Sequence, residues 1–212
     1  MATLSPRQSP WSNREARERE RESKREAVLA TAVQFFNQKG FHATSLDDVA
    51  TALNVTKPTI YHYFSNKDEI LFECVGRGLS ALREAADAAA ARGGSGMDRL
   101  RALMREYALV MTQDFGICVT RTADAELAEE SRLKFRALKR EIDETIRGVV
   151  EDGMRDGSIA QGDARLMTFT LSGSLNWVAR WYDPKGPMSA SEIADGAVSM
   201  LVNGLAPRGE AV

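Results

Sequence analysis

Cysteine and histidine each occur only twice in these 212 residues, and no apolar run reaches the length of about 18 that crosses a membrane. Cys74 and Cys118 lie far apart, so we expect two reduced thiols that pack as small apolar groups, although the sequence does not exclude a disulfide. No cluster has metal-ligand spacing, so we expect neither a metal nor a cofactor. The first residues lack the basic-then-apolar order of a signal peptide, so we expect a cytoplasmic protein without a membrane partner.

The chain also has no large excess of one charge, because its formal net charge is only −2. Residues 1–66 contain nine Lys or Arg and seven Asp or Glu, a net of +2, which leaves −4 for the rest of the chain. This asymmetry is weak. It agrees with a nucleic-acid-binding face near the N-terminus but does not establish one.

Alternating strand patterns are absent as well, and the periodicity predicts an all-α fold. We expect helices over about 14–39, 46–53, 56–64, 67–91, 97–113, 124–156, 163–182 and 189–205. The domain boundaries that we predict are a flexible N-terminal arm over 1–18, a helix-turn-helix domain over 19–66, a larger ligand-binding and dimerisation domain over 67–206, and a tail over 207–212. Gly93-Gly94-Ser95-Gly96 is the clearest break, and it follows a helix rather than a strand, so we interpret it as a linker and not a phosphate-binding loop.

Two short helices carry the functional interpretation. Ser45 and Asp48 have capping-box spacing at the start of the first helix, and Asn54-Val55 ends it. Thr56 precedes the second helix, where Pro58 is tolerated in the first turn. Two helices of this length, joined by a tight turn, have the dimensions of a helix-turn-helix.

The second short helix, within TKPTIYHYF, presents polar and aromatic side chains on the face opposite its apolar anchors. If it enters a DNA groove, phosphate contacts set the register while base-edge contacts read the sequence. The predicted DNA-binding residues are Thr44, Ser45, Lys57, Tyr61 and Lys67 for phosphates, Thr59 and His62 for base edges, and Thr56 facing the groove. Helix pairs of this kind also occur in helical proteins that bind no DNA, so the pattern alone leaves both interpretations open.

A family resemblance favours DNA binding. The segments GFHATS (40–45), DVA (48–50), NVTKPTIYHYF (54–64) and KDEIL (67–71) closely resemble the N-terminal signature of the TetR/AcrR transcriptional regulators. The match covers about residues 24–72. Pro58 stands where the family more often has a small residue, which changes which side chain enters the groove.

The resemblance implies a nine-helix subunit and a homodimeric repressor that binds pseudo-palindromic operator DNA and is released by a small-molecule effector. It also implies that the two C-terminal helices pair across a two-fold axis as a four-helix bundle. From the periodicity we predict a seam of Leu171, Leu175, Val178 and Tyr182, with Gly173 and Ala179 permitting close approach; the alternative is that these residues form intramolecular core.

The effector is indicated less specifically. We expect ligand-binding residues among those facing the interior of 67–182, namely Phe72, Met104, Tyr107, Met111, Phe135, Leu138 and Trp177, although such residues are more often core than pocket lining. The segment NWVARWYDP (176–184) is similar to family members that sense acyl-CoA thioesters. That similarity implies phosphate contact by Arg180 and adenine stacking by Trp181, against the alternative of an Arg–carboxylate pair and a buried indole.

Other functional classes are less well supported. An enzyme needs a nucleophile–base pair, paired carboxylates or a phosphate-cradling glycine loop, and none is recognisable here. A helical adaptor that holds a protein on the same surface remains an alternative, and no residue distinguishes repression from activation. We expect the helix over 67–91 to couple the two domains.

Overall fold

The structure, a computed structural model, describes residues 13–203, and within them every regular element is a helix. The predicted all-α fold is therefore confirmed. The elements are α1 (Asn13–Lys39), α2 (Leu46–Ala52), α3 (Lys57–Tyr61), α4 (Lys67–Ala90), α5 (Gly96–Val110), α6 (Asp114–Arg121), the 3-10 turn η2 (Asp124–Glu126), α7 (Glu129–Asp156), α8 (Ala164–Trp181) and α9 (Ala190–Asn203). Among these helices, none is long and apolar enough to span a membrane.

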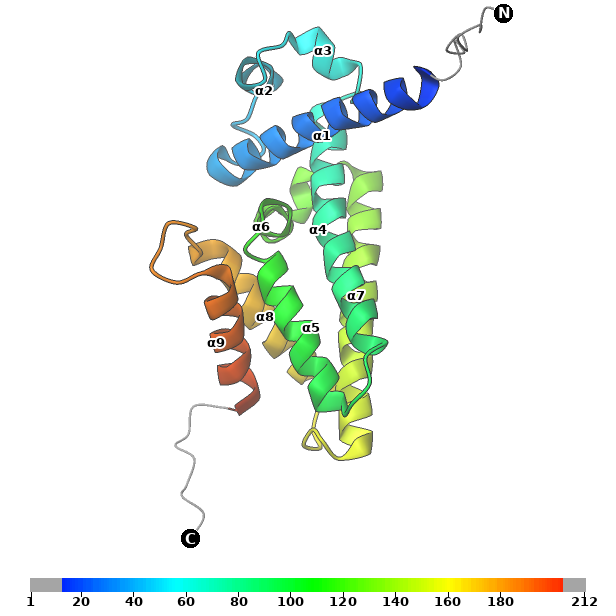
Figure 1. The fold of residues 1–212 in the computed structure, drawn as a ribbon, viewed down its shortest axis with the longest axis vertical. Coiled ribbons are helices and arrows are strands. Elements are labelled where there is room, and N and C mark those ends of the chain that lie inside the picture. Colours follow the sequence, from blue (N-terminus) through cyan, green and yellow to red (C-terminus); the bar gives the residue numbers. More distant parts are fainter. Residues whose placement is uncertain (1–12, 204–212) are drawn as a thin grey trace, which may run out of the picture.

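Helix α4 connects the two ends of the molecule. It passes under α1, which lies across the top with α2 and α3 above it, and then runs down the body beside α7 (Figure 1). Helices α5, α6 and α7 pack against α4, and α8 and α9 complete the lower part by packing on α7 and α5. An element that touches both α1 and the lower helices can transmit a displacement between them.

Ion pairs join α1 to α4. Arg25 donates to Glu73, with 2.5 Å between Nη1 and Oε1, and its guanidinium stacks on the Phe64 ring at 4.8 Å. One turn further along α4, Arg77 pairs with Glu26. The Arg25–Glu73 pair is roughly three-quarters buried (side-chain exposures of 28% and 23%), so solvent screens it less than an ordinary surface pair.

Helix α6 was not predicted from the sequence. Its segment DFGICVTR is short and contains one glycine and three β-branched residues, which are weak helix formers. Packing compensates: a Cβ on Gly78 of α4 would lie 2.5 Å from the carbonyl oxygen of Phe115, and a Cβ on Gly116 would collide with the carbonyl of Val110. Tertiary contact at these two glycines, rather than local propensity, supports the helix.

Other element predictions need correction. The helix predicted from about residue 14 begins at Asn13, so the arm predicted over 1–18 overlaps α1 at residues 13–18; residues 1–12 and the predicted tail at 207–212 lie outside the described range. The helix predicted from 124 begins at Glu129, because η2 and an extended Leu127, buried as an apolar anchor, precede it. Caps were predicted better: Gly40 has a φ of +83°, and the Ser45–Asp48 capping box is present.

The predicted dimer seam is also wrong in part. Leu175, Val178 and Ala179 are at most 3% exposed within the subunit, and Leu171 and Tyr182 are half-buried, so these residues pack mainly on their own helices. The opposite face of α8 is exposed instead. We call Leu166, Gly173, Trp177 and Trp181 the α8 stripe; the three large side chains are 50–65% exposed. Periodicity located an apolar face but could not say which apolar face the subunit itself covers.

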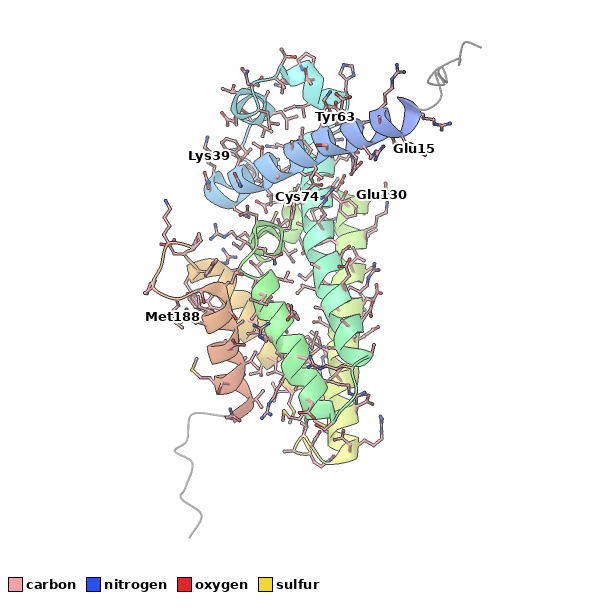
Figure 2. The ribbon with its side chains drawn as sticks, viewed as in Figure 1. Glu15, Lys39, Tyr63, Cys74, Glu130 and Met188 are labelled. Atoms are coloured by element: carbon pink, nitrogen blue, oxygen red, sulfur yellow. The ribbon has the colours of Figure 1, made fainter. Side chains whose placement is uncertain are left out.

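Both cysteines are free and buried. Cys74 lies on α4 where α1 crosses it (Figure 2), and its thiol approaches the carbonyl oxygen of Leu29 at 3.9 Å. Burial raises the pKa of the Cys118 thiol to about 12. Both groups therefore act as small apolar side chains, as expected from the sequence.

Candidate nucleic-acid interface and ligand cavity

The helix pair α2–α3 is fixed from within and exposed on its outer face. Ile60 and Phe64 are 0% and 1% exposed and anchor the second helix, while Asn54 makes the turn with a φ of +54°, a conformation that asparagine tolerates better than most residues. Tyr61 is 49% exposed and His62 is also exposed. The anchors hold α3 so that these two side chains face away from the protein.

Three of the predicted DNA-contacting residues, Thr56, Lys57 and Thr59, lie at the N-cap or in the first turn of α3, and a fourth, Ser45, caps α2. Lys57 forms an ion pair with Asp47 of α2 at 2.8 Å. The hydroxyl oxygens of Thr56 and Thr59 lie 3.0 Å apart. Ser45 is exposed, but its hydroxyl accepts from the backbone N–H of Asp48 at 3.1 Å. Lys57 can exchange an exposed carboxylate for a phosphate at little cost, since exposed ion pairs contribute little stability.

Thr44 and Lys67, both predicted to contact phosphates, are held by contacts within the protein. The side chain of Thr44 is 1% exposed, and its hydroxyl donates to the carbonyl of Gly40 at 2.9 Å. The Lys67 ammonium donates to the carbonyls of Phe41 and Thr44 at 2.8 and 2.9 Å, and lies 4.3 Å from the centre of the Phe41 ring. Together they hold the loop before α2, a role that spacing alone does not reveal.

A cavity of about 530 Å³ opens among α4, α5, α6, α7 and α8. Its apolar wall comes from Leu79, Leu82, Val119, Ile142 and Phe169. Polar groups face the same space: the Tyr107 hydroxyl donates to Asn176 Oδ1 at 2.8 Å, and Lys139, Asp143 and Arg180 line it. Apolar walls with a few polar groups are typical of small-molecule sites.

The sequence predicted only part of this cavity. Tyr107, Trp177 and Arg180 line it, but Met104, Met111 and Phe135 are 0% exposed and belong to closed core, and Phe72 and Leu138 pack partly buried against that core. Trp177 is 65% exposed, so it lies at the rim rather than inside, and Trp181 is outside the lining. Periodicity identifies inward positions but not where packing leaves space. The α6 residues Val119, Thr120 and Thr122 were missed with their helix.

Two groups in the cavity have perturbed acidity. Burial raises the pKa of the Asp143 carboxyl, and nearby Lys139 and Arg147 oppose that shift only partly. Burial also raises the pKa of Tyr107 well above its ordinary value, so its hydroxyl stays protonated at neutral pH and keeps donating to Asn176 Oδ1. Arg180 donates to the carbonyl of Thr120 at 3.0 Å and closes the α6 side.

The cavity walls also contact the N-terminal helices. Arg121 at the end of α6 donates to the carbonyl of Asn37 in α1 and, at 3.3 Å, to that of Ala179 in α8. The Asn37 amide in turn donates to the carbonyl of Asp114 at 2.9 Å. Two elements, α4 and α6, therefore line the cavity and touch α1.

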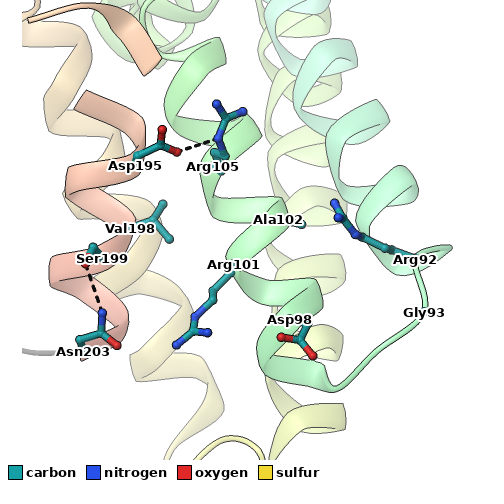
Figure 3. A pocket seen from close by; sticks show the side chains of 10 residues that line it. All are labelled: Arg92, Gly93, Asp98, Arg101, Ala102, Arg105, Asp195, Val198, Ser199 and Asn203. Carbon is teal, nitrogen blue, oxygen red and sulfur yellow. Dashed lines mark hydrogen bonds and ion pairs between the residues drawn. The ribbon is translucent and has the colours of Figure 1, made fainter. Parts of the chain in front are cut away.

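A second groove, of about 630 Å³, lies at the far end of the molecule between α5 and α9 (Figure 3). Arg105 of α5 donates there to Asp195 at 2.7 Å and to the Ser191 hydroxyl at 2.9 Å. Neither α6 nor α1 contributes to the lining. We interpret these contacts as ties that hold α9 on α5.

Comparison with known families identifies the family of a chain that combines a helix-turn-helix with a central cavity. Residues 28–74 match the family model "Bacterial regulatory proteins, tetR family", and residues 93–205 match "Tetracyclin repressor-like, C-terminal domain". The chain belongs to the TetR family of transcription regulators. As predicted, it is a DNA-binding regulator and not an enzyme.

Several relatives match this TetR-family regulator over most of their length. The transcriptional repressor KstR2 of Rhodococcus jostii is 26% identical over 86% of this chain and 91% of its own. The structure of PfmR from Thermus thermophilus aligns with a TM-score of 0.78 and 31% identity, over 85% of this chain and 99% of that one. AibR, in complex with isovaleryl coenzyme A and operator DNA, aligns with a TM-score of 0.75 and 28% identity, over 84% and 97%.

Proposed function

We propose that this regulator is a repressor that binds a pseudo-palindromic operator as a homodimer and is released by a small-molecule effector, with acyl-CoA thioesters as the effector class. The observation that carries the proposal is that α4 and α6 both line the cavity and both contact α1. A ligand that occupies the cavity must touch the two elements on which the DNA-binding helices rest.

The operator contacts are assigned to the exposed face of the α2–α3 pair. Lys57, Tyr61 and Ser45 would contact phosphates, and Thr59 and His62 would read base edges, with Thr56 beside them. Thr44 is left out because its side chain is buried, and Lys67 because its ammonium donates to two backbone carbonyls. Contacts of this kind make operator affinity fall steeply as salt concentration rises.

The dimer is assigned to α8 and α9. The α8 stripe exposes one leucine and two tryptophans, and Met200 of α9 is 56% exposed. The three large apolar side chains on one exposed face of α8 are typical of an interface. A two-fold pairing of these helices gives two α3 helices related by symmetry, and therefore an operator with two related half-sites.

The effector is assigned to the central cavity. Its apolar wall suits an acyl chain, the Asn176 amide nitrogen can donate to a thioester carbonyl while its oxygen accepts from Tyr107, and Arg180 supplies positive charge. The AibR complex shows that a relative of the same fold binds an acyl-CoA. Trp181 is 50% exposed in the subunit and belongs to the α8 stripe, so adenine stacking on it would take place at the edge of the proposed dimer interface.

The proposed release of the regulator from its operator acts through α4. We infer that a bound thioester displaces α4 relative to α6, tilts the α1–α3 unit through the Arg25–Glu73 and Arg121 contacts, and changes the separation of the two α3 helices. Equal α3 separation in effector-bound and DNA-bound crystals would contradict this mechanism.

A thermal-shift screen against acyl-CoA thioesters of increasing chain length tests the effector class. A ligand that binds only the native state raises its melting temperature, in proportion to the logarithm of concentration over Kd. At 100 times Kd the stabilisation is about 2.7 kcal/mol. If no thioester shifts the melting temperature while a ligand of another class does, the effector assignment is wrong and the regulator assignment stands.

A further inference from the structure

A cation-rich groove on the outside of α7 and α8 adjoins the central cavity. It has a volume of about 390 Å³. Five cationic and two acidic side chains line it together with one aromatic ring: Arg136, Lys139, Arg140, Arg147, Arg165, Asp143, Glu144 and Phe169. The groove therefore carries a net positive charge on a molecule whose formal net charge is −2.

Helical spacing brings these cations together. Arg136, Arg140 and Arg147 lie at intervals of four and seven residues on α7, so they share one face of the helix. Arg165 faces them from the first turn of α8, where its guanidinium lies 5.4 Å from the centre of the Phe169 ring. Two helices thus supply arginines to a single groove.

Most of these cations have no acidic partner. Arg136 pairs with Asp124 at 2.5 Å. Across residues 13–203, no salt bridge involves Arg140, Arg147 or Arg165. Clustered like charges repel, so a multiply charged anion in the groove would relieve that repulsion.

The groove and the cavity are adjacent. Lys139, Asp143 and Phe169 line both spaces, so only these side chains separate the apolar wall at Ile142 from the arginines outside. A ligand that displaces these side chains would occupy both spaces, with an apolar part inside and an anionic part in the groove.

We propose that this α7–α8 groove binds the phosphate-bearing head group of an amphiphilic effector whose acyl chain fills the cavity. The inference rests on the proposed effector site, and it assigns the phosphate contacts to Arg140, Arg147 and Arg165 in addition to Arg180. Guanidinium groups bind phosphate oxygens in bidentate pairs, which suits a head group with several phosphates better than a single carboxylate.

Three probes and two variants test the groove by calorimetry. The probes are octanoyl-CoA, octanoyl-pantetheine, which has the same thioester but no phosphate, and CoA, which has the phosphates but no acyl chain. The test variant is the double substitution Arg140→Gln and Arg147→Gln. The control is Arg83→Gln, which removes an exposed arginine on α4 outside the groove.

The expected result is an affinity for octanoyl-CoA that is about 100-fold lower in the double variant, roughly tenfold for each charge-assisted contact. Octanoyl-pantetheine should bind the wild type and the double variant equally, and Arg83→Gln should change nothing. CoA should bind the wild type weakly and the double variant not at all.

Two outcomes would contradict phosphate binding in the groove. One is equal affinity of the wild type and the double variant for octanoyl-CoA, and the other is equal affinity of the wild type for octanoyl-CoA and octanoyl-pantetheine. The proposed function is assessed separately, by whether octanoyl-CoA releases the wild type from its operator. CoA binding that depends on Arg140 and Arg147, without operator release, would support the groove and contradict the thioester as effector.

Discussion

At the scale of single residues, local spacing predicted which side chains are exposed. It did not predict which polar side chains are hydrogen-bonded within the protein. Tyr61 and His62 were assigned to the outer face of α3 because they lie between the anchors Ile60 and Phe64, and the structure exposes both. Thr44 and Lys67 looked equally suited to phosphates, but the fold of the loop before α2 captures their polar atoms. A loop conformation depends on contacts 23 residues apart in sequence, which no local pattern reports.

Tyr61 tests the recognition helix. The substitution Tyr61→Ala should weaken operator binding about tenfold or more for each half-site, because it removes a hydroxyl contact to a charged phosphate worth about 1.5–3 kcal/mol. Its thermal melting should be unchanged, because the side chain is 49% exposed. Fluorescence anisotropy with labelled operator measures the affinity. Tyr61→Phe, which removes only the hydroxyl, should show most of the loss of operator affinity seen for Tyr61→Ala. Unchanged affinity in both variants would contradict the assignment of α3 to the DNA interface.

Asp143 should give effector binding a pH dependence. Burial raises its pKa, so its carboxyl gains a proton as pH falls toward that raised value, and the cavity becomes more positive. Asp143→Asn should therefore bind an acyl-CoA more tightly than the wild type at pH 7.5, by about 1 kcal/mol. The difference should shrink at lower pH, because the raised pKa makes the wild-type carboxyl take up a proton as pH falls. Calorimetry at pH 7.5 and at lower pH checks it, and a constant ratio would exclude Asp143 from the site.

At the scale of elements, long periodic helices were predicted and the short helix α6 was not. α4 and α7 bury continuous apolar faces, so their periodicity is visible in the sequence. α6 has only eight residues and lacks a side-chain cap, and its position depends on close contacts at Gly78 of α4 and at its own Gly116. The cavity was predicted incompletely for the same reason, since α6 supplies part of its lining.

The close approach of α4 and α6 can be tested at Gly78. A Cβ there would lie 2.5 Å from the Phe115 carbonyl oxygen and 2.6 Å from Val119, so Gly78→Ala must push α6 away. The expected cost is about 1–3 kcal/mol of unfolding free energy. Gly76→Ala on the same helix meets nothing within 4 Å and should be stabilising by about 0.5–1 kcal/mol. Urea denaturation compares them; equal stabilities would contradict the tight contact.

At the scale of the whole molecule, the family resemblance predicted the architecture more completely than periodicity did. It implied nine α-helices, and the described residues 13–203 contain nine, whereas the residue patterns alone indicated eight. The order of helices and the position of α4 between the two ends follow the family fold. The dimer face could not be chosen from sequence, because α8 has apolar residues on both faces and only packing shows which is covered.

The α8 stripe should hold the dimer together. Leu166 is 65% exposed in the subunit, so Leu166→Glu should leave subunit folding intact while placing a charge in the proposed interface. Leu133→Glu on α7, where the leucine is 61% exposed, is the matched control. Analytical ultracentrifugation should find a monomer for Leu166→Glu and a dimer for the control. A dimeric Leu166→Glu would place the interface elsewhere.

Coupling between the cavity and the DNA-binding helices is the central claim, and operator release measures it most directly. Wild-type protein bound to a labelled operator is titrated with octanoyl-CoA while anisotropy is recorded, alongside Arg121→Ala, which removes the α6 contacts to Asn37 and Ala179. We predict that the thioester releases the wild type, and that Arg121→Ala binds operator and thioester but needs more thioester for release. Thioester binding without any release from DNA would contradict the account.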